Sequence, residues 1–349
     1  MRTKRGRSGV QSSLALSAVA AGGLLWLRSR RGTSYSLRGR TVLVTGGSRG
    51  LGLALAREAA RQGARVAVCG RDPETLSRAH AALERIGGPV TAVECDVTDR
   101  SAVRELVATV SQRLGPVDVL INNAGVIEVG PAETMAIEDY EEAMATNFWG
   151  MVHPTLEIIP AMKARGDGRI VNITSIGGKL AFPHLLPYCA SKFAAVGFSQ
   201  GLRAELSRDG IKVVTVAPGL MRTGSPRNAT FRGDHRAEYA WFSIGDSLPG
   251  LSVSVASAAR RIIARARRGD AEVIFPVPAR LAVWLNALAP DLTAGTLGLT
   301  NRLLPSPPQH ETGRRKGKES PSWLSPSWMT RLGDRAARRY NQVAPAEAQ

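Results

Sequence analysis

Residues 41–63 read TVLVTGGSRGLGLALAREAARQG, and this stretch decides the fold. It begins with a short β-branched run, passes through a glycine turn and ends in a segment whose apolar residues recur at helical spacing. Glycines let such a turn close and let its backbone approach a pyrophosphate group, while the following helix supplies free N–H groups and the positive end of its dipole. The residues that we expect to contact a dinucleotide here are Gly46, Ser48, Arg49, Gly50, Leu51 and Gly52.

The alternation of strand and helix continues along the chain to residue 276. Apolar runs predict strands at 41–45, 65–69, 90–95, 117–121, 169–174, 211–216 and 272–276. Helical spacing fills the intervals, with a long helix at about 138–163 and another at about 187–207. Continuous apolar runs are typical of strands buried on both faces, so the pattern predicts an α/β protein with a doubly wound parallel sheet, a Rossmann fold of about seven strands. Such sheets bind ligands beyond the carboxyl ends of their strands.

Composition narrows the classes of function. The chain has 349 residues and a net charge of +17, with 44% apolar residues. Nine basic residues and no acidic ones lie within 1–40, and nine basic against four acidic within 301–349, so the body is close to neutral. This distribution disfavours a nucleic-acid-binding face on the folded body. Three cysteines without paired spacing predict no disulfide framework, and the five histidines show no ligand spacing, so we expect no metal site.

The ends predict three parts: a basic leader over 1–37, a catalytic domain over 38–278 and a C-terminal extension over 279–349. Residues 8–27 carry no charge and, as a helix, would be about 30 Å long, which fits a membrane anchor. A cleaved signal peptide, with Ala18-Val19-Ala20 as its cleavage site, a mitochondrial presequence and a disordered leader stay open as alternatives. The anchor predicts membrane association with the catalytic domain facing the cytoplasm, although basic residues on both sides of the segment give no clear orientation.

The C-terminal extension changes character twice. Residues 281–305 are apolar and interrupted by Pro290, so they either pack on the body or lie at a membrane surface. The Pro- and Gly-rich stretch 306–323 predicts a flexible linker. Its run Arg314-Arg315-Lys316 is interpreted as solvated rather than lipid-binding, and residues 330–341 are compatible with a short basic helix.

The end of the second predicted strand indicates which dinucleotide binds. An NAD enzyme usually has an acidic residue there for the ribose 2′-hydroxyl. Here the strand ends in Cys69-Gly70-Arg71, and the first acid, Asp72, comes only after Arg71. Because a guanidinium grips phosphate in a bidentate manner, Arg49 and Arg71 favour the 2′-phosphate of NADP. The alternative is that both arginines are merely solvated.

The glycine turn has a rival interpretation. Gly46-Gly47-Ser48-Arg49-Gly50 also matches G-x-S-x-G, the nucleophile elbow of α/β-hydrolases. The turn follows the first strand of the predicted sheet, and no upstream strand and loop are present in this sequence to build an oxyanion hole. We therefore disfavour a hydrolase.

The ordered motifs make residues 38–278 resemble the single-domain short-chain dehydrogenases/reductases. The matching stretches are TGGSRGLG at 45–52, Cys95-Asp96-Val97, Asn122-Asn123-Ala124-Gly125, Asn147, Ser175, Tyr188 with Lys192, and Pro218-Gly219 with Thr223. The resemblance implies that Asp96 and Val97 meet the adenine and that Asn123, Ala124, Gly125, Pro218, Gly219 and Thr223 complete the cofactor site. It covers neither the first 37 residues nor the tail.

The same resemblance implies a catalytic set that physical chemistry supports. Tyr188 and Lys192 are four residues apart and share one face of a helix. An ammonium near a phenol lowers the phenol pKa from about 10, so we expect Tyr188 to act as the proton donor. Ser175 is expected to donate a hydrogen bond to the developing oxyanion, with neighbouring Thr174 as the alternative. By family analogy, Lys192 also holds the nicotinamide ribose, and Asn147 holds a water that links Lys192 to solvent.

Together these features predict an NADP(H)-dependent enzyme that interconverts a carbonyl and an alcohol. Membrane proximity suggests a lipophilic substrate, and the partly aromatic stretch 224–252 is expected to form the substrate lid. The resemblance implies a homo-oligomer of unspecified size. The alternative is a catalytically silent NADP-binding scaffold or sensor at a membrane. The retained Ser175, Tyr188 and Lys192 argue against it, because a scaffold needs no proton donor.

Overall fold

The computed structural model of the chain describes residues 35–248, 250–307, 313–322, 325, 327 and 329–343. Internal contacts divide the chain into Met1–Ser36 and Leu37–Gln349, and the second unit holds the sheet. The predicted anchor at 8–27 lies outside the described residues. Among the residues that are described, no helix combines the length and the apolarity needed to cross a bilayer.

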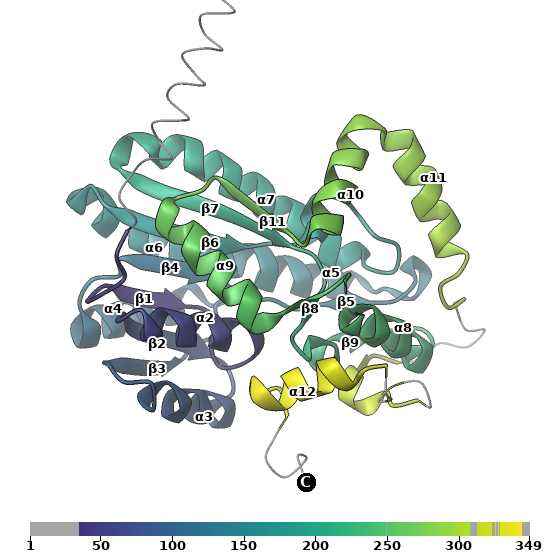
Figure 1. Ribbon diagram of the computed structural model, residues 1–349, viewed down its shortest axis with the longest axis horizontal. Helices are drawn as coiled ribbons and strands as arrows, with labels where there is room; N and C mark the ends of the chain where they lie inside the picture. The colour runs from purple at the N-terminus through teal and green to yellow at the C-terminus, as the bar shows by residue number, and fades with distance from the viewer. Residues whose placement is uncertain are drawn as a thin grey trace, which may run out of the picture. The chain divides into compact units, whose positions relative to one another are not determined.

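A seven-stranded parallel sheet forms the centre of the second unit (Figure 1). Its order is β3-β2-β1-β4-β6-β7-β11. The strands are β1 (Thr41–Val44), β2 (Arg65–Gly70), β3 (Val90–Glu94), β4 (Val119–Asn122), β6 (Gly168–Ile173), β7 (Ile211–Pro218) and β11 (Glu272–Phe275). Successive strands are added outward from β1 toward β3 on one side, and from β4 toward β11 on the other. The boundary between β1 and β4 is therefore the switch point, where such sheets bind ligands. The predicted doubly wound α/β fold is confirmed.

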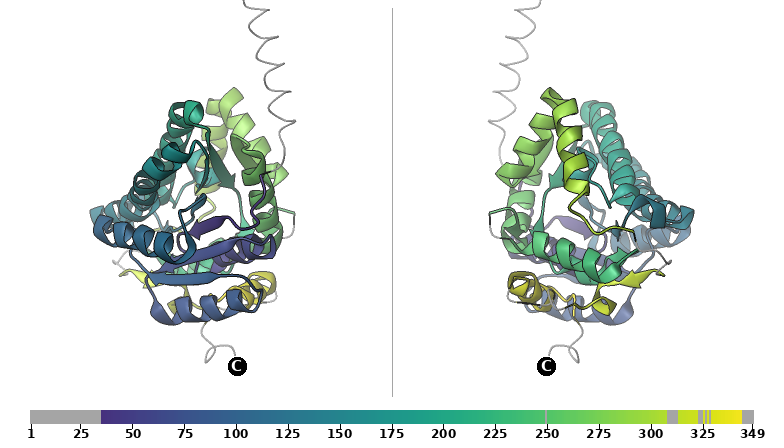
Figure 2. Two further views of the ribbon diagram at one scale, coloured as in Figure 1. Left: turned by 90° about the vertical axis from the view of Figure 1, so that its left-hand side faces the viewer. Right: turned by 90° about the vertical axis from the view of Figure 1, so that its right-hand side faces the viewer.

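Helices cover both faces of the sheet (Figure 2). They are α2 (Gly50–Arg61), α3 (Pro73–Glu84), α4 (Arg100–Leu114), α5 (Ile137–Met144), α6 (Gly150–Arg165), α7 (Leu186–Leu206) and α9 (Val255–Arg268). Helix α2 packs against α9, and α4 packs against α6. One apolar cluster joins α4, α6 and α7 to the inner strands through side chains such as Leu106, Ile158 and Leu202. The single long helix predicted at 138–163 is divided by a π-helical turn at Ala145–Trp149.

Local capping fixes where several helices begin. The Asp72 carboxylate accepts a hydrogen bond from the Thr75 N–H at 2.9 Å and caps α3, with Pro73 in the first turn. Asp99 caps α4 and Ser254 caps α9 in the same way. Caps of this kind stabilise a helix by about 1 kcal/mol each.

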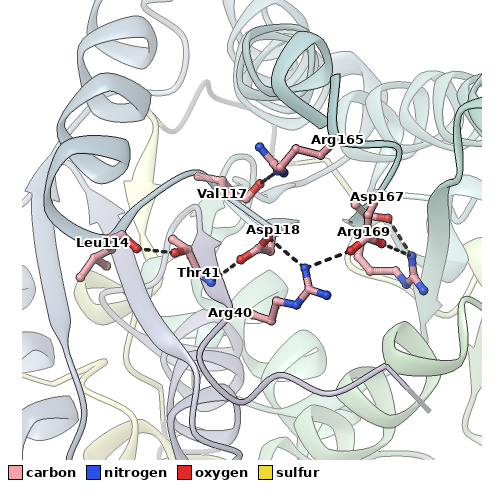
Figure 3. A network of polar contacts seen from close by, with 9 residues as sticks. Arg40, Thr41, Leu114, Val117, Asp118, Arg165, Asp167 and Arg169 are labelled. Atoms are coloured by element: carbon pink, nitrogen blue, oxygen red, sulfur yellow. Dashed lines mark hydrogen bonds and ion pairs between the residues drawn. The ribbon is translucent and has the colours of Figure 1, made fainter. Parts of the chain in front are cut away.

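A polar network ties together the amino ends of the inner strands, opposite the ligand-binding edge (Figure 3). The Asp118 carboxylate accepts from the Thr41 N–H at 2.8 Å and from Arg40 Nη1 at 3.2 Å. Arg40 Nη1 also donates to Asp167 Oδ2 at 3.0 Å, and Arg165 Nη2 donates to the Val117 carbonyl at 2.8 Å. The network therefore joins β1, β4 and β6 and holds the register from which the site is built.

The C-terminal extension contributes to the fold. Strand β12 (Arg315–Lys316) pairs with β9 (Thr230–Phe231), which pairs with β5 (Glu128–Val129) in a three-stranded sheet. The basic run is not fully solvated: Arg314 forms an ion pair with Glu142, and Lys316 Nζ donates to Thr230 Oγ1 at 2.8 Å. The prediction of a flexible, solvated stretch was therefore wrong for residues 313–322, because antiparallel pairing with β9 orders them.

The remaining elements lie around the ligand-binding edge and beyond it. Strands β8 (Met221–Arg222) and β10 (Val253–Ser254) pair with each other, and α8 (His235–Ser247) lies between them in the sequence. Helices α10 (Val277–Leu288) and α11 (Pro290–Asn301) follow β11, and α12 (Arg331–Arg339) comes last. The basic helix expected at 330–341 is thus present as α12.

Candidate active site

The glycine turn after β1 is locked to the loop after β4. Buried Thr45 accepts hydrogen bonds at its Oγ1 from the N–H groups of Asn123 (2.9 Å) and Ala124 (3.1 Å). In return, Asn123 Nδ2 donates to the carbonyl oxygens of Thr45 (3.0 Å) and Gly46 (3.2 Å). Two motifs that are 78 residues apart thereby form one rigid edge at the switch point.

Glycine is sterically required in this turn. A Cβ atom at Gly52 would overlap the Gly46 carbonyl oxygen and would lie 2.6 Å from Asn123 Nδ2. Gly46 has a φ of +61°, and a Cβ there would lie 2.9 Å from the Ala124 Cα. The turn is therefore tight, and its lack of side chains is the property that lets the backbone of such a turn approach a phosphate group closely.

Charged residues lie beside this turn. Arg71 Nη1 lies 3.6 Å from Asp96 Oδ2, and the other Asp96 oxygen accepts from the Thr98 N–H at 2.9 Å. Arg49 Nη1 donates to Asn228 Oδ1 at 3.1 Å. Both arginine residues are exposed, so each guanidinium can turn toward an incoming anion.

Val97 is buried, and a Cβ atom at Gly150 would lie 2.6 Å from it, which shows how closely the loop after β3 approaches α6.

The structure brings Ser175 and Tyr188 together around Gly177. A Cβ at Gly177 would lie 3.1 Å from Tyr188 Cε1 and 3.4 Å from Ser175 Oγ, so both side chains lie close to this glycine. Ser175 Oγ accepts from the Gly177 N–H at 3.0 Å, which orients the hydroxyl. Thr174, the alternative, donates its hydroxyl to the Val216 carbonyl at 2.7 Å and is engaged in the sheet.

Lys192 and Asn147 meet on the other side of Tyr188. Lys192 is buried, its Nζ donates to the Ile173 carbonyl at 3.4 Å, and it lies 5.7 Å from the Tyr188 ring centre. A Cβ at Gly125 would lie 3.5 Å from Lys192 Nζ and 2.8 Å from Asn147 Oδ1. The loop after β4 thus approaches both side chains.

Hydrogen bonds hold the Asn147 amide firmly. Its Oδ1 accepts from the Val126 N–H at 3.0 Å, while Nδ2 donates to the Val126 carbonyl at 3.1 Å and to Ser191 Oγ at 3.0 Å. Both amide hydrogens are used, so the amide can offer a water only the second lone pair of Oδ1. The residue lies in the π-helical turn, a feature that is frequent at functional sites.

Burial governs the proton affinities of the two ionisable groups. It raises the pKa of Tyr188 above its ordinary value, and a hydrogen bond with Ser175 acts in the opposite direction. It also lowers the pKa of Lys192 to about 8, while the carboxylate of Glu128 opposes that shift. We expected the ammonium to lower the phenol pKa. This expectation was wrong, because desolvation of the phenolate is the larger effect.

The last of the predicted motifs is Pro218-Gly219 with Thr223, which follows β7. The Gly219 N–H donates to the Phe275 carbonyl at 2.7 Å, which fixes the chain after Pro218 against β11. Thr223 is buried, and its hydroxyl accepts from the Ser225 N–H at 3.0 Å. In the expected lid, Phe231 and Tyr239 are buried against each other, with Trp241 and Phe242 packed beside them, so these aromatics form a small core.

Sequence reasoning missed that the end of the chain lies on the glycine turn. The Gly50 N–H donates to the Tyr340 carbonyl at 2.8 Å. Asn341 Nδ2 donates to the Ser48 carbonyl at 2.8 Å, and Asn341 Oδ1 accepts from Arg78 Nε at 2.7 Å. We name residues 340–342 the C-terminal strap. It engages one of the N–H groups that the helix would offer to a phosphate.

A buried acidic residue beside the candidate catalytic residues was also missed. Glu128 is 1% exposed, and within the described residues neither of its oxygens has a hydrogen-bond partner. Burial raises its pKa to about 8. The flanking backbone is tied to the site, because Val126 bonds Asn147 and Gly130 donates to the His184 carbonyl at 2.8 Å. The one available signal was an acid inside the apolar run VIEV.

Known proteins share this fold and these motifs. A sequence model of the short chain dehydrogenase family matches residues 40–231. Dehydrogenase/reductase SDR family member 7B of Bos taurus is 34% identical over 305 residues, which is 85% of this chain and 88% of that protein. A putative ketoacyl reductase of Streptomyces coelicolor is 42% identical over 184 residues, covering 52% of this chain and 70% of the relative.

Solved structures agree with these sequence relatives. A variant of actinorhodin polyketide ketoreductase, crystallised with NADPH, has a TM-score of 0.61 and 35% identity. The alignment covers 67% of this chain and 95% of the ketoreductase. The chain therefore belongs to the short-chain dehydrogenase/reductase family, as its motifs indicated, and it is an oxidoreductase of that family.

Proposed function

We propose that the protein is an NADP(H)-dependent oxidoreductase that interconverts a carbonyl and an alcohol through Ser175, Tyr188 and Lys192, with Asn147 as the fourth member of the set. The observation that carries this proposal is the pair of close approaches at Gly177 and Gly125, which gather the four side chains at one strand edge. That edge adjoins the glycine turn, whose steric limits fit a dinucleotide. The NADPH in the related ketoreductase structure supports the choice of cofactor.

In the proposed reduction, Tyr188 donates its hydroxyl proton to the substrate carbonyl oxygen. NADPH, when bound, supplies the hydride to the carbonyl carbon. Because burial raises the pKa of Tyr188, the phenol keeps its proton at neutral pH until charge develops on the oxygen. Ser175 stabilises that charge through a hydrogen bond from its hydroxyl.

Lys192 serves two purposes in this proposal. Its ammonium binds the ribose beside the nicotinamide ring and stabilises the phenolate that Tyr188 becomes. A Lys192 pKa of about 8 leaves it mostly protonated at neutral pH and lets it take part in proton return to Tyr188. Asn147 acts through the second lone pair of its Oδ1, the place left for a water that links Lys192 to solvent.

The preference for NADP rests on the two exposed arginines near the turn. Arg49 and Arg71 would flank a bound 2′-phosphate in this proposal, and the turn leading out of β2 offers no acid before Arg71. The prediction is that Arg71→Ala weakens NADPH binding by about tenfold, the loss of one charge-assisted contact, and leaves NADH binding within about twofold. Isothermal titration with both cofactors measures this, and an equal loss for the two would contradict it.

The C-terminal strap competes with the cofactor in this proposal. Asn341→Ala removes the three side-chain hydrogen bonds of this residue, to Ser48, Thr75 and Arg78, so Tyr340 leaves the Gly50 N–H more readily. We expect NADPH to bind about tenfold to 100-fold more tightly, because three hydrogen bonds of about 1 kcal/mol each no longer hold the strap on the turn. Exposed Leu332→Ala in α12 is the control. Weaker NADPH binding by Asn341→Ala would mean that the strap supports the cofactor instead.

Glu128 is expected to set the pH range of the reaction. Its carboxylate raises the pKa of Lys192, so removing that charge in Glu128→Gln lowers the pKa at which Lys192 loses its proton. The alkaline limb of the kcat/KM profile should therefore move to lower pH. Exposed Glu133→Gln serves as the charge-matched control. A profile that coincides with the wild type would contradict the electrostatic coupling.

The substrate in this proposal is lipophilic. The half-buried Trp241 and Phe242 of the aromatic cluster lie near His184, whose loop leads into Tyr188, and this arrangement favours an apolar substrate body. A panel of ketones and aldehydes of graded hydrophobicity, followed by the loss of NADPH absorbance, tests the activity. Consumption with none of them would favour the non-catalytic scaffold.

We also propose that the protein is membrane-associated through residues 8–27, with the catalytic domain facing the cytoplasm, and that it forms a homo-oligomer. The uncharged run between basic residues supports the anchor. Fractionation of the full chain against a chain that begins at Ser36 tests it. Equal solubility of the two would contradict the anchor, and the molecular mass of the shorter chain in solution reports the oligomer.

A further inference from the structure

Helices α10 and α11 form a two-helix projection that follows the edge strand β11 (Figure 1). We propose that this projection, residues 277–303, inserts into one leaflet of a lipid bilayer and is a membrane contact separate from residues 8–27. The proposal concerns the surface alone and does not depend on the reaction.

Apolar side chains are exposed along both helices. On α10, Leu281, Trp284, Leu285 and Leu288 follow helical spacing, and Leu288 is 85% exposed. On α11 and directly after it, Leu292, Leu299 and Leu303 are exposed as well. Ala279 and Thr293 are the buried residues of the two helices. Exposed leucines of this density mark an interaction surface.

Charged residues are scarce in the projection and lie mostly near its two ends. From 281 to 301 the single charged residue is Asp291, whereas Arg280 and Arg302 stand immediately before and after. A surface helix in water normally carries a charged face opposite its apolar stripe, and these two helices lack one. Apolar helices with arginines at their ends fit hydrocarbon flanked by anionic headgroups, where Trp284 is also favoured.

The hydroxyl groups of α11 need no water. Thr293 Oγ1 donates to the Ala289 carbonyl at 3.1 Å, Thr296 to the Leu292 carbonyl at 2.8 Å and Thr300 to the Thr296 carbonyl at 2.9 Å. Threonines in membrane helices satisfy their hydroxyls through the carbonyl four residues earlier, because lipid offers no partner. This satisfaction lowers the cost of moving α11 out of water.

The dimensions exclude a complete span. Each helix has 12 residues and is about 18 Å long, against about 30 Å for the hydrocarbon core. The pair therefore reaches into one leaflet as a shallow hairpin. A second copy of the chain is the competing occupant. Because exposed positions lie on nearly every side of α11, one flat protein partner would leave much of that helix uncovered, and lipid is favoured.

The projection adjoins the catalytic edge. Asn286 Nδ2 donates to the Lys179 carbonyl at 3.3 Å, and Lys179 lies four residues after Ser175. Lys179 is itself held by an ion pair with Glu272 in β11 at 2.6 Å. Insertion of the projection would therefore bring the rim of the site close to the lipid surface.

A site-specific fluorescent label tests the insertion. The native Cys69, Cys95 and Cys189 are buried, so a thiol-reactive, environment-sensitive dye should label Leu288→Cys selectively in the full chain. With vesicles of phosphatidylcholine and phosphatidylserine, we expect a blue shift of the dye and quenching by brominated acyl chains. The matched control is a dye on exposed Gln112→Cys in α4, which should show neither effect.

The label reports on the projection itself, even where residues 8–27 bring the chain to the vesicle. A dye at position 288 that stays accessible to aqueous iodide on vesicle-bound protein would overturn the proposal, and so would failure of the chain to bind vesicles. A blue shift without vesicles that grows with protein concentration would identify a second copy as the occupant and overturn it too.

Discussion

Tyr188→Phe is expected to lower kcat by about 10²- to 10⁴-fold, the range that general acid catalysis contributes. The substitution removes one oxygen atom and keeps the ring that packs against Gly177. Without the hydroxyl, the developing oxyanion loses its proton donor, and Ser175 alone cannot neutralise it. NADPH binding should stay within about twofold of the wild type, because the ring and Lys192 remain in place.

The measurement is a pair of assays on the same preparation: steady-state turnover of the best carbonyl substrate and titration of NADPH by fluorescence. Tyr140→Phe in α5 makes the same chemical change away from the site and should leave both values unaltered. Turnover by Tyr188→Phe within about tenfold of the wild type would refute the catalytic assignment.

Gly52→Ala is expected to abolish useful NADPH binding, with affinity lowered by more than about tenfold. The new methyl group would overlap the Gly46 carbonyl and crowd Asn123 Nδ2, so the turn and the loop after β4 must separate. Overpacking of this kind costs about 1–3 kcal/mol of folding stability, so the melting temperature should fall as well.

The matched control lies in a helix interior with open space. A Cβ atom added to Gly197 in α7 would meet nothing within 4 Å, so Gly197→Ala should stabilise the protein by about 0.5–1 kcal/mol and leave NADPH binding alone. If Gly52→Ala bound NADPH as the wild type does, the turn would not be the cofactor site.

The sheet and its helices could be predicted because their signals are local. The helix expected at 187–207 is observed at Leu186–Leu206, and each predicted strand agrees within two residues. The break of the long helix at Ala145–Trp149 could not be predicted, because it depends on the bonds between Asn147 and Val126. The pairs of residues in β5, β9 and β12 are too short for any periodicity to show.

The candidate site, like the fold, has features that local sequence patterns predict and features that they do not. The four-residue spacing of Tyr188 and Lys192 predicted a shared helix face, and the structure brings Tyr188 close to Ser175 and Lys192 close to Asn147. The order of their proton affinities depends on burial, which no local pattern reports. The contact between the C-terminal strap and the glycine turn could not be predicted, because Asn341 and Ser48 are 293 residues apart in the sequence. Glu128 could have been selected from the sequence, because an acidic residue within an apolar run indicates a specific role.

The most direct test of the central claim follows the hydride and the proton donor together. The protein is incubated with NADPH that carries deuterium at both hydrogen positions of nicotinamide C4 and with the best carbonyl substrate, and the alcohol is analysed by mass spectrometry. The account predicts one deuterium on the carbinol carbon with the wild type and no labelled alcohol above background with Tyr188→Phe. Unlabelled alcohol from the wild type, or equal labelling by both proteins, would contradict it.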